Sequence, residues 1–178
     1  MSNFAPVERD TATGKAAELL AQVQKSVGQA PNMTKVMANS PVLLKSWLVL
    51  SGAVAGGTLP AAVRERLAIS TAQLNGCEYC LSAHTYLGAN VAKVDPAELE
   101  SARKGESNDP HVAALLKLSN DIAANAGDVD DDDVEAARAA GVTDEEIGEL
   151  VANLALNILT NYFNVLARVD NDWPVVSL

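Results

Sequence analysis

Three side chains that can do chemistry lie within eight residues of one another. They are Cys77, Cys80 and His84, in the stretch LNGCEYCLSAH, and they include both cysteines and one of the two histidines of the chain. If a helix begins near Cys77, they fall at positions i, i+3 and i+7 and project from one stripe of that helix. Two cysteines separated by two residues at a helix start can close a disulfide with little movement of the backbone. The spacing therefore predicts that the three side chains act as a unit.

The start of a helix favours the reactive form of a cysteine, because unpaired backbone amides there stabilise a thiolate. A thiol with its free pKa of about 8.5 is a few per cent ionised at neutral pH, whereas a pKa of about 7 makes roughly half of it nucleophilic. His84 lies one turn after Cys80 and can accept the thiol proton. This pattern favours a redox-active pair.

A base also needs a group that orients it, and Glu65 is the candidate. It lies among apolar positions of a helix expected over Pro60 to Leu74, so its carboxylate should be buried and should have a partner. Folding the chain about a turn at residues 75–76 places Glu65 about 15 Å before the turn and His84 about 12 Å after it. A relay from Glu65 through His84 to Cys80 is therefore sterically possible, although the sequence does not determine which helix faces meet.

Two other interpretations of this cluster remain open. Two cysteines, a histidine and a nearby glutamate can make a tetrahedral zinc site, although structural zinc sites usually draw a second ligand pair from elsewhere. Free cysteines are also often inert, small and apolar parts of a core. A permanent structural disulfide is disfavoured, because we expect a cytoplasmic protein, whose thiols are kept reduced.

The sequence as a whole predicts an all-α protein, in one domain over residues 1–178. Alanine supplies much of the apolar content, only 4% of residues are aromatic, and no alternating run marks a strand. Prolines and capping residues mark the helix starts, and glycines mark most of the ends. The expected helices run from Thr11 or Thr13 to about Val27, Asn32 to Asn39, Pro41 to Gly56, Pro60 to Leu74, Cys77 or Glu78 to about Ala92, Pro96 to Gly105, Pro110 to Ala126, Asp130 to Ala140 and Thr143 to about Val169.

Two packing expectations follow from this pattern. Val63, Leu67 and Leu74 give the Glu65 helix a second apolar face, which predicts that it is enclosed on both sides. His111 follows Asp109-Pro110 in the first turn of a helix and has no acidic or cysteine neighbour at helical spacing, so we expect it at the surface.

Charge and hydropathy exclude several classes of partner. A net charge of −10 without a Lys/Arg cluster repels nucleic acid and anionic lipid. The longest apolar run, Pro41 to Gly57, contains Lys45 and falls short of the roughly 20 residues that cross a bilayer. The stretch MSNFAPVERD lacks the apolar core of a secretory signal. We therefore expect no nucleic-acid or membrane partner.

The acidic run Asp128 to Asp133 is the other motif that could bind a metal. It lacks the glycine and the glutamate that a calcium-binding EF-hand loop needs at its sixth and twelfth positions. Carboxylates are favourable at a helix N-terminus, so we interpret the run as the start of a helix.

The four residues Glu65, Cys77, Cys80 and His84 resemble a known family pattern. With eleven residues between Glu65 and Cys77, the pattern resembles that of the AhpD-like alkylhydroperoxidases of the carboxymuconolactone decarboxylase superfamily, in its peroxidase-related branch. The flanking stretches APNMTKVMANSP, LPAAVRERLAIS and NYFNVLARVDNDWP agree with it. The resemblance is firm over a motif core at residues 41–92. It implies an AhpD-like helical bundle, built around a helical hairpin that carries the four residues, and assembly into homotrimers or homohexamers.

The resemblance also implies a function and roles for these residues. The protein would reduce organic hydroperoxides with no metal, haem or flavin. Cys80 would become a sulfenic acid, and Cys77 would donate a proton and then close the Cys77–Cys80 disulfide. Glu65 and His84 would form the proton relay. An external dithiol or a thioredoxin-like protein would reopen the disulfide.

One departure from the family pattern is Tyr79, which stands where the best-known members have a histidine. Tyr79 can donate a hydrogen bond, which makes it a candidate substrate-binding residue, but it is a poor base near neutral pH. Thiol–disulfide exchange or redox sensing with little peroxidase turnover is therefore an alternative function. A lactone decarboxylase is a second alternative, against which the cysteine pair argues, and a zinc-binding structural subunit is a third.

Overall fold

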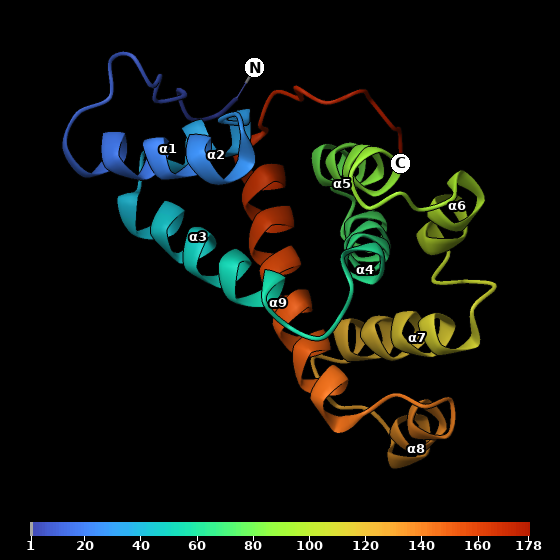
Figure 1. The fold of residues 1–178 in the computed structure, drawn as a ribbon. Coiled ribbons are helices and arrows are strands. Elements are labelled where there is room, and N and C mark those ends of the chain that lie inside the picture. Colours follow the sequence, from blue (N-terminus) through green and yellow to red (C-terminus); the bar gives the residue numbers. More distant parts are fainter. Residues whose placement is uncertain (1) are drawn as a thin grey trace.

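The computed structural model describes residues 2–178, and over these residues it contains nine α-helices and no strand (Figure 1). The all-α prediction is confirmed, and each expected helix is present with its ends within a few residues of the prediction. The helices are α1 (Gly14–Val27), α2 (Asn32–Met37), α3 (Pro41–Ala55), α4 (Ala61–Leu74), α5 (Glu78–Asn90), α6 (Pro96–Arg103), α7 (Pro110–Ala124), α8 (Asp131–Ala139) and α9 (Asp144–Ala167).

The long helix α9 is the element around which the others are arranged. Helices α1 to α3 lie on one side of it, the α4–α5 hairpin and α6 lie on the other, and α7 and α8 lie near its N-terminal end (Figure 1). It packs against α3, α4, α5 and α7. Its start is fixed by a capping box, in which the side chains of Thr143 and Glu146 each bond to the backbone of the other.

Helix α9 is also the one helix within residues 2–178 that is long and apolar enough to cross a membrane, judged by length and composition alone. This stretch is longer than the apolar run at residues 41–57. However, 44% of its most apolar 18-residue stretch is buried inside the protein. A core helix has the same properties, so they are weak support for a membrane span.

The apolar core has two clusters of side chains, and α4 belongs to both. Ile69 packs into a cluster with α1, α2 and α5, whereas Val63 and Leu67 pack into a second cluster with α7, α8 and the start of α9. The prediction that this helix is enclosed on both sides is confirmed for these residues. It is wrong for Leu74, which is the last residue of α4 and is 54% exposed.

The start of α4, which carries Glu65, is fixed against α9 by Glu149. This carboxylate accepts backbone N–H bonds from Thr58 at 2.6 Å and from Leu59 at 2.8 Å, and these bonds lower its pKa. Glycine at position 57 leaves room for this approach, because a Cβ atom there would lie 2.5 Å from the carboxylate as it now stands. These bonds connect the loop before α4 to α9.

His111 is only partly at the surface, contrary to our expectation. Its Nε2 lies 2.9 Å from Oε1 of Glu146, and its side chain is 34% exposed. The hydrogen bond to Glu146 raises the pKa of His111. The partner lies 35 residues away in the sequence, so helical spacing around His111 could not reveal it. The acidic run behaves as expected, since Asp131, Asp132 and Asp133 form the first turn of α8.

Candidate active site

The turn between α4 and α5 brings the two cysteines together. Gly76 has a left-handed backbone, with a φ of 65°, which glycine adopts without steric cost. Cys77 is the N-cap of α5, and its sulfur accepts the backbone N–H of Cys80 at 3.2 Å. The structure contains a disulfide between Cys77 and Cys80, whose Cα atoms are 5.3 Å apart. Both sulfurs thus share the start of one helix and are bonded to each other.

The partner of Glu65 is His84. The Nδ1 atom of His84 lies 2.8 Å from Oε2 of Glu65, and the two side chains are 25% and 21% exposed. A carboxylate can only accept a hydrogen bond, so Nδ1 carries the proton. In the neutral imidazole, Nε2 then has the free electron pair that a proton acceptor needs. The faces of α4 and α5 that carry Glu65 and His84 therefore do meet.

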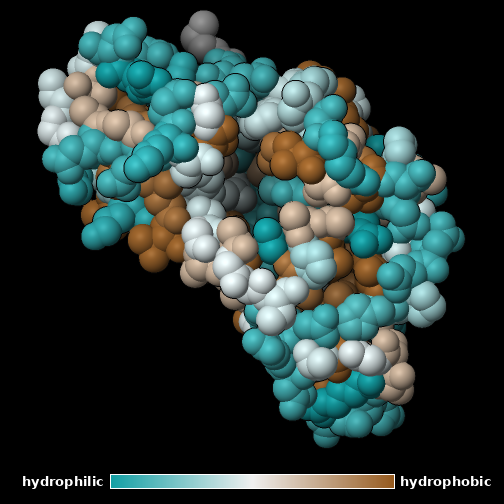
Figure 2. Space-filling model, in the orientation of Figure 1, coloured by the Kyte–Doolittle hydropathy of each residue, from teal (hydrophilic) through white to brown (hydrophobic). Residues whose placement is uncertain are grey.

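Cys80, Glu65 and His84 line one cavity of about 280 Å³. It lies between α1 to α3 on one side and the α4–α5 hairpin on the other, with α9 contributing a further wall, and the face drawn in Figure 2 is hollowed between these two parts. Most of its lining is apolar. The lining residues include Val27, Met33, Trp47, Val54, Ala68, Tyr79, Ala83, Leu87, Asn153, Leu156, Asn157, Thr160, Asn164 and Trp173.

The two sulfurs have different access to this cavity. Cys80 is among the lining residues described, and Cys77 is not. The cysteines are 3% and 1% exposed, respectively. A reagent that attacks the disulfide, or that is attacked by a thiolate, must therefore enter the cavity and meet Cys80 first.

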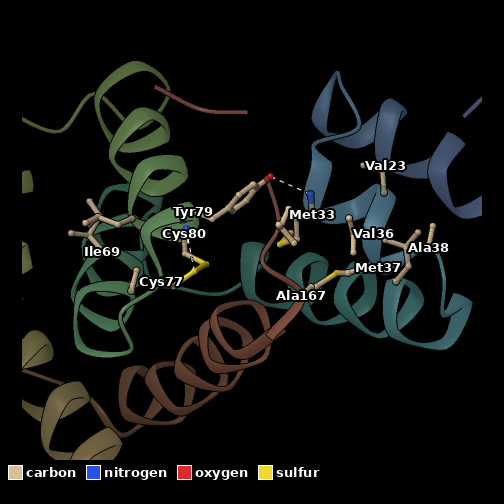
Figure 3. Close-up of a cluster of buried hydrophobic side chains, with 14 of the residues drawn as sticks. Val23, Met33, Val36, Met37, Ala38, Ile69, Cys77, Tyr79, Cys80 and Ala167 are labelled. Carbon is tan, nitrogen blue, oxygen red and sulfur yellow. Dashed lines mark hydrogen bonds between the residues drawn. A yellow bond between two sulfur atoms is a disulfide. The ribbon is translucent and has the colours of Figure 1, made fainter. Parts of the chain in front are cut away.

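Tyr79 reaches from α5 toward the start of α2 (Figure 3). Its hydroxyl donates to Oδ1 of Asp172 at 2.8 Å and accepts the backbone N–H of Met33 at 3.3 Å. Burial and the charge of Asp172 raise the pKa of the phenol, which stays protonated and cannot act as a base near neutral pH. The ring lines the cavity, but the hydroxyl proton is already donated to Asp172. A role of Tyr79 in binding substrate stays a prediction.

Sequence reasoning did not identify three residues of this site. They are Asn164 on α9, and Asp172 and Trp173 in the segment after α9 that runs back over α5 (Figure 1). Nδ2 of Asn164 lies 3.2 Å from the sulfur of Cys80. The available signal was the row of asparagines in α9, at positions 153, 157, 161 and 164, because buried amides on an apolar helix need partners.

The structure gives the zinc interpretation no support. Within residues 2–178, no group of three or more His, Cys, Asp or Glu side chains is placed to hold a metal ion. The two sulfurs that would be zinc ligands are bonded to each other instead.

Comparison with known sequences gives a family and a distant relative. Residues 41–115, from α3 into α7, match the model of the carboxymuconolactone decarboxylase family. An alkyl hydroperoxide reductase of Mycobacterium tuberculosis is 26% identical over 118 residues, which are 64% of this chain and 34% of the reductase. The chain thus spans about a third of the length of this relative.

Comparison with solved structures gives the same fold. The AhpD core structure of a peroxidase-related protein from Ralstonia eutropha superposes with a TM-score of 0.84, at 22% identity, over 96% of this chain and 92% of that one. The debrominase Bmp8 in complex with 2,3,4-tribromopyrrole superposes with a TM-score of 0.80, at 16% identity, over 97% and 92%. The predicted AhpD-like fold is confirmed. The family match spans Glu65, both cysteines and His84, so this part of the chain is similar to the carboxymuconolactone decarboxylase family, and the chain has the AhpD-like fold.

Proposed function

We propose that this protein is a thiol-dependent peroxidase that reduces organic hydroperoxides at Cys80. The observation that carries the proposal is that Cys80 lines the same apolar cavity as the hydrogen-bonded Glu65–His84 pair, with Cys77 bonded behind it. The distant relation to an alkyl hydroperoxide reductase supports the same reaction.

The reaction begins with the reduced protein. Nε2 of His84 accepts the proton of the Cys80 thiol, and Glu65 stabilises the imidazolium that forms. The thiolate gives an electron pair to the outer oxygen of the hydroperoxide, and the O–O bond breaks. Cys80 becomes a sulfenic acid, and the alkoxide takes up a proton and leaves as the alcohol.

The second half of the cycle uses Cys77. Its sulfur attacks the sulfur of Cys80, the S–S bond forms, and the sulfenic hydroxyl leaves with a proton as water. An external dithiol then reduces the disulfide and is itself oxidised to a disulfide. Because both sulfurs are buried, we infer that the reductant presents its thiols on a small molecule or on a flexible arm that enters the cavity.

Counting thiols is the direct test of this function. We expect reduced protein to have two titratable thiols and to lose both when about one equivalent of cumene hydroperoxide is added, because one peroxide oxidises one dithiol. Mass spectrometry should then find the Cys77–Cys80 disulfide within one chain, and chromatography should find one cumyl alcohol per disulfide. If both thiols persist through excess hydroperoxide, the protein is not a peroxidase.

Reductive removal of a halogen from an aromatic ring is a second candidate. The apolar cavity, with Trp47 and Trp173 in its lining, suits a flat ring, and the debrominase Bmp8 has the same fold. In this reaction, one aryl bromide and the two thiols of Cys77 and Cys80 give the arene, hydrogen bromide and one disulfide. Bromide release from 2,3,4-tribromopyrrole by reduced protein, with the hydroperoxide leaving the thiols intact, would favour this reaction.

The remaining alternatives fit the site less well. Exchange with the disulfide of another protein needs that disulfide to enter the cavity, because Cys77 and Cys80 are almost fully buried. A lactone decarboxylase has no use for a disulfide that faces the substrate cavity.

We also propose that the protein assembles into a homotrimer or homohexamer. Helix α3 is strongly apolar, but Leu44 is its one buried residue among those described. It leaves Val42 and Val49 76% and 63% exposed, and apolar side chains lie at the surface along this helix in Figure 2. Exposed apolar surface of this kind marks protein interfaces. Sedimentation velocity should give three or six chains per particle, and a monomer at micromolar concentration would contradict this assembly.

A further inference from the structure

The amide of Asn164 is directed at the reactive sulfur. This side chain is on α9 and is only 3% exposed. Its Nδ2 atom lies 3.2 Å from Sγ of Cys80 and 3.3 Å from Sδ of Met33. Both contacts of the amide nitrogen are therefore with sulfur atoms, and one of them is the sulfur that faces the cavity.

The contact with sulfur explains the orientation of this amide. A disulfide or thiolate sulfur has no hydrogen and can only accept, so the amide must present its NH2 group to Cys80. As a result the carbonyl oxygen Oδ1 of Asn164 is buried with no hydrogen-bond partner among the described residues. Such an unpaired acceptor destabilises the fold.

Two other asparagines of the same helix show how a purely structural pair would look. Nδ2 of Asn157 donates to the backbone oxygen and to Oδ1 of Asn153, at 2.9 and 2.8 Å. Both are buried, and the amide donor of Asn157 is paired with the amide acceptor of Asn153. Asn164 lies further along the same helix and leaves its oxygen unpaired, as Asn161 leaves its Nδ2, but Asn164 alone of the two directs its amide nitrogen at the sulfur of Cys80. We therefore attribute its placement to that sulfur.

The two cysteines compete for the negative charge of the reduced state. Cys77 is the N-cap of α5, and its sulfur accepts the backbone N–H of Cys80. A helix N-terminus stabilises a thiolate, so the helix start alone favours charge on Cys77. However, Cys80 is the sulfur that faces the cavity. A donor to the sulfur of Cys80 would therefore act with His84 to favour charge on Cys80 over Cys77.

We propose that Asn164 is a catalytic residue that selects Cys80 over Cys77 as the nucleophile. Its N–H group stabilises the Cys80 thiolate before attack and the polar sulfenic acid after it. The assisted step is the one described above, in which the thiolate attacks the outer peroxide oxygen and the alcohol leaves. This inference rests on the proposed peroxidase function for that step, and it deepens it by naming the group that decides which sulfur attacks.

Alkylation of the reduced protein tests this selection without any peroxide. Limited iodoacetamide is applied over a pH series, and proteolytic cleavage after Glu78 separates the two cysteines for mass spectrometry. We expect Cys80 to react first in the wild type. In Asn164→Ala the pH at which alkylation of Cys80 is half-maximal should rise by about one unit. The ratio of labelled Cys80 to labelled Cys77 at neutral pH should then fall about tenfold.

The matched control is Asn161→Ala, on the same helix. Asn161 is also buried, but it bonds to Asn75 and does not line the cavity. Its truncation should leave the labelling ratio at the wild-type value. Asn164→Asp keeps the shape and replaces the donor with a carboxylate, so it should raise the midpoint for Cys80 further than Asn164→Ala does.

The peroxide reaction provides a separate readout. We expect the rate constant with cumene hydroperoxide to fall about tenfold or more in Asn164→Ala, because one donor to the reacting atom is lost. If the wild type consumes no peroxide but the labelling ratio still changes, the peroxidase function fails and the selection by Asn164 stands. If the ratio is unchanged while the wild type turns over, the selection is wrong and the peroxidase function stands.

A measurement on the wild type decides the question if the variants do not fold. The side-chain NH2 resonances of Asn164 in the reduced protein should shift with pH at the same midpoint as Cys80 alkylation. Resonances of Asn164 that do not respond while Cys80 titrates would overturn the proposal.

Discussion

Cys80→Ser should consume cumene hydroperoxide no faster than buffer does, a loss of at least about a thousandfold relative to the wild type. Cys80 is the sulfur that faces the cavity, and a serine hydroxyl at the same place is not ionised near neutral pH. The measurement is the rate of cumyl alcohol formation with excess dithiothreitol. Circular dichroism should show that the fold is retained, because the substitution replaces a buried sulfur with a smaller oxygen and adds no bulk.

The matched variant is Cys77→Ser, which should separate the two roles. It keeps the nucleophile and loses the thiol that resolves it, so a sulfenic acid should accumulate on Cys80. Dimedone should trap this species on Cys80 after a single addition of hydroperoxide. If Cys80→Ser reacts at the wild-type rate and Cys77→Ser is inert, the roles of the two cysteines are reversed.

Glu65→Gln should lower the peroxidase rate constant by about a hundredfold, within the range usual for loss of acid–base assistance. Glutamine can still accept the Nδ1–H bond of His84, which holds the ring in place at 2.8 Å in the wild type. It cannot stabilise the positive charge that His84 acquires when it takes the thiol proton. Alkylation of Cys80 should accordingly need a higher pH than in the wild type.

A second His–Glu pair in the same chain is the control. Nε2 of His111 lies 2.9 Å from Glu146, and neither residue lines the cavity. Glu146→Gln therefore removes an equivalent charge and should leave the pH dependence of Cys80 alkylation unchanged. An unchanged alkylation profile in Glu65→Gln as well would remove Glu65 from the relay.

The helices could be predicted because their boundaries are local. Thr143 and Glu146 form a capping box within four residues, and Pro41, Pro96 and Pro110 each begin a helix. The position of Glu65 opposite His84 on the α4–α5 hairpin could also be predicted, because the distance of each residue from the turn follows from the rise per residue of an α-helix.

The surroundings of the cysteines could not be predicted in the same way. Asn164 lies 84 residues from Cys80, and Asp172 lies 93 residues from Tyr79. Such pairs depend on how α9 and the segment after it pack on α5, which no short stretch of sequence determines. The same reason explains why His111 was expected at the surface, since Glu146 belongs to another helix.

The closeness of Cys77 and Cys80 bears on how readily Cys80 would be oxidised irreversibly in the proposed reaction. A sulfenic acid that meets a second peroxide is driven to the irreversible sulfinic state. Here the rescuing thiol is one helical turn away, with the two Cα atoms 5.3 Å apart. Well-oriented groups on one chain react as if at an effective concentration of about 10⁵ M or more, far above any dissolved oxidant. In the proposed peroxidase cycle, this proximity lets Cys77 capture the Cys80 sulfenic acid before a second peroxide oxidises it irreversibly.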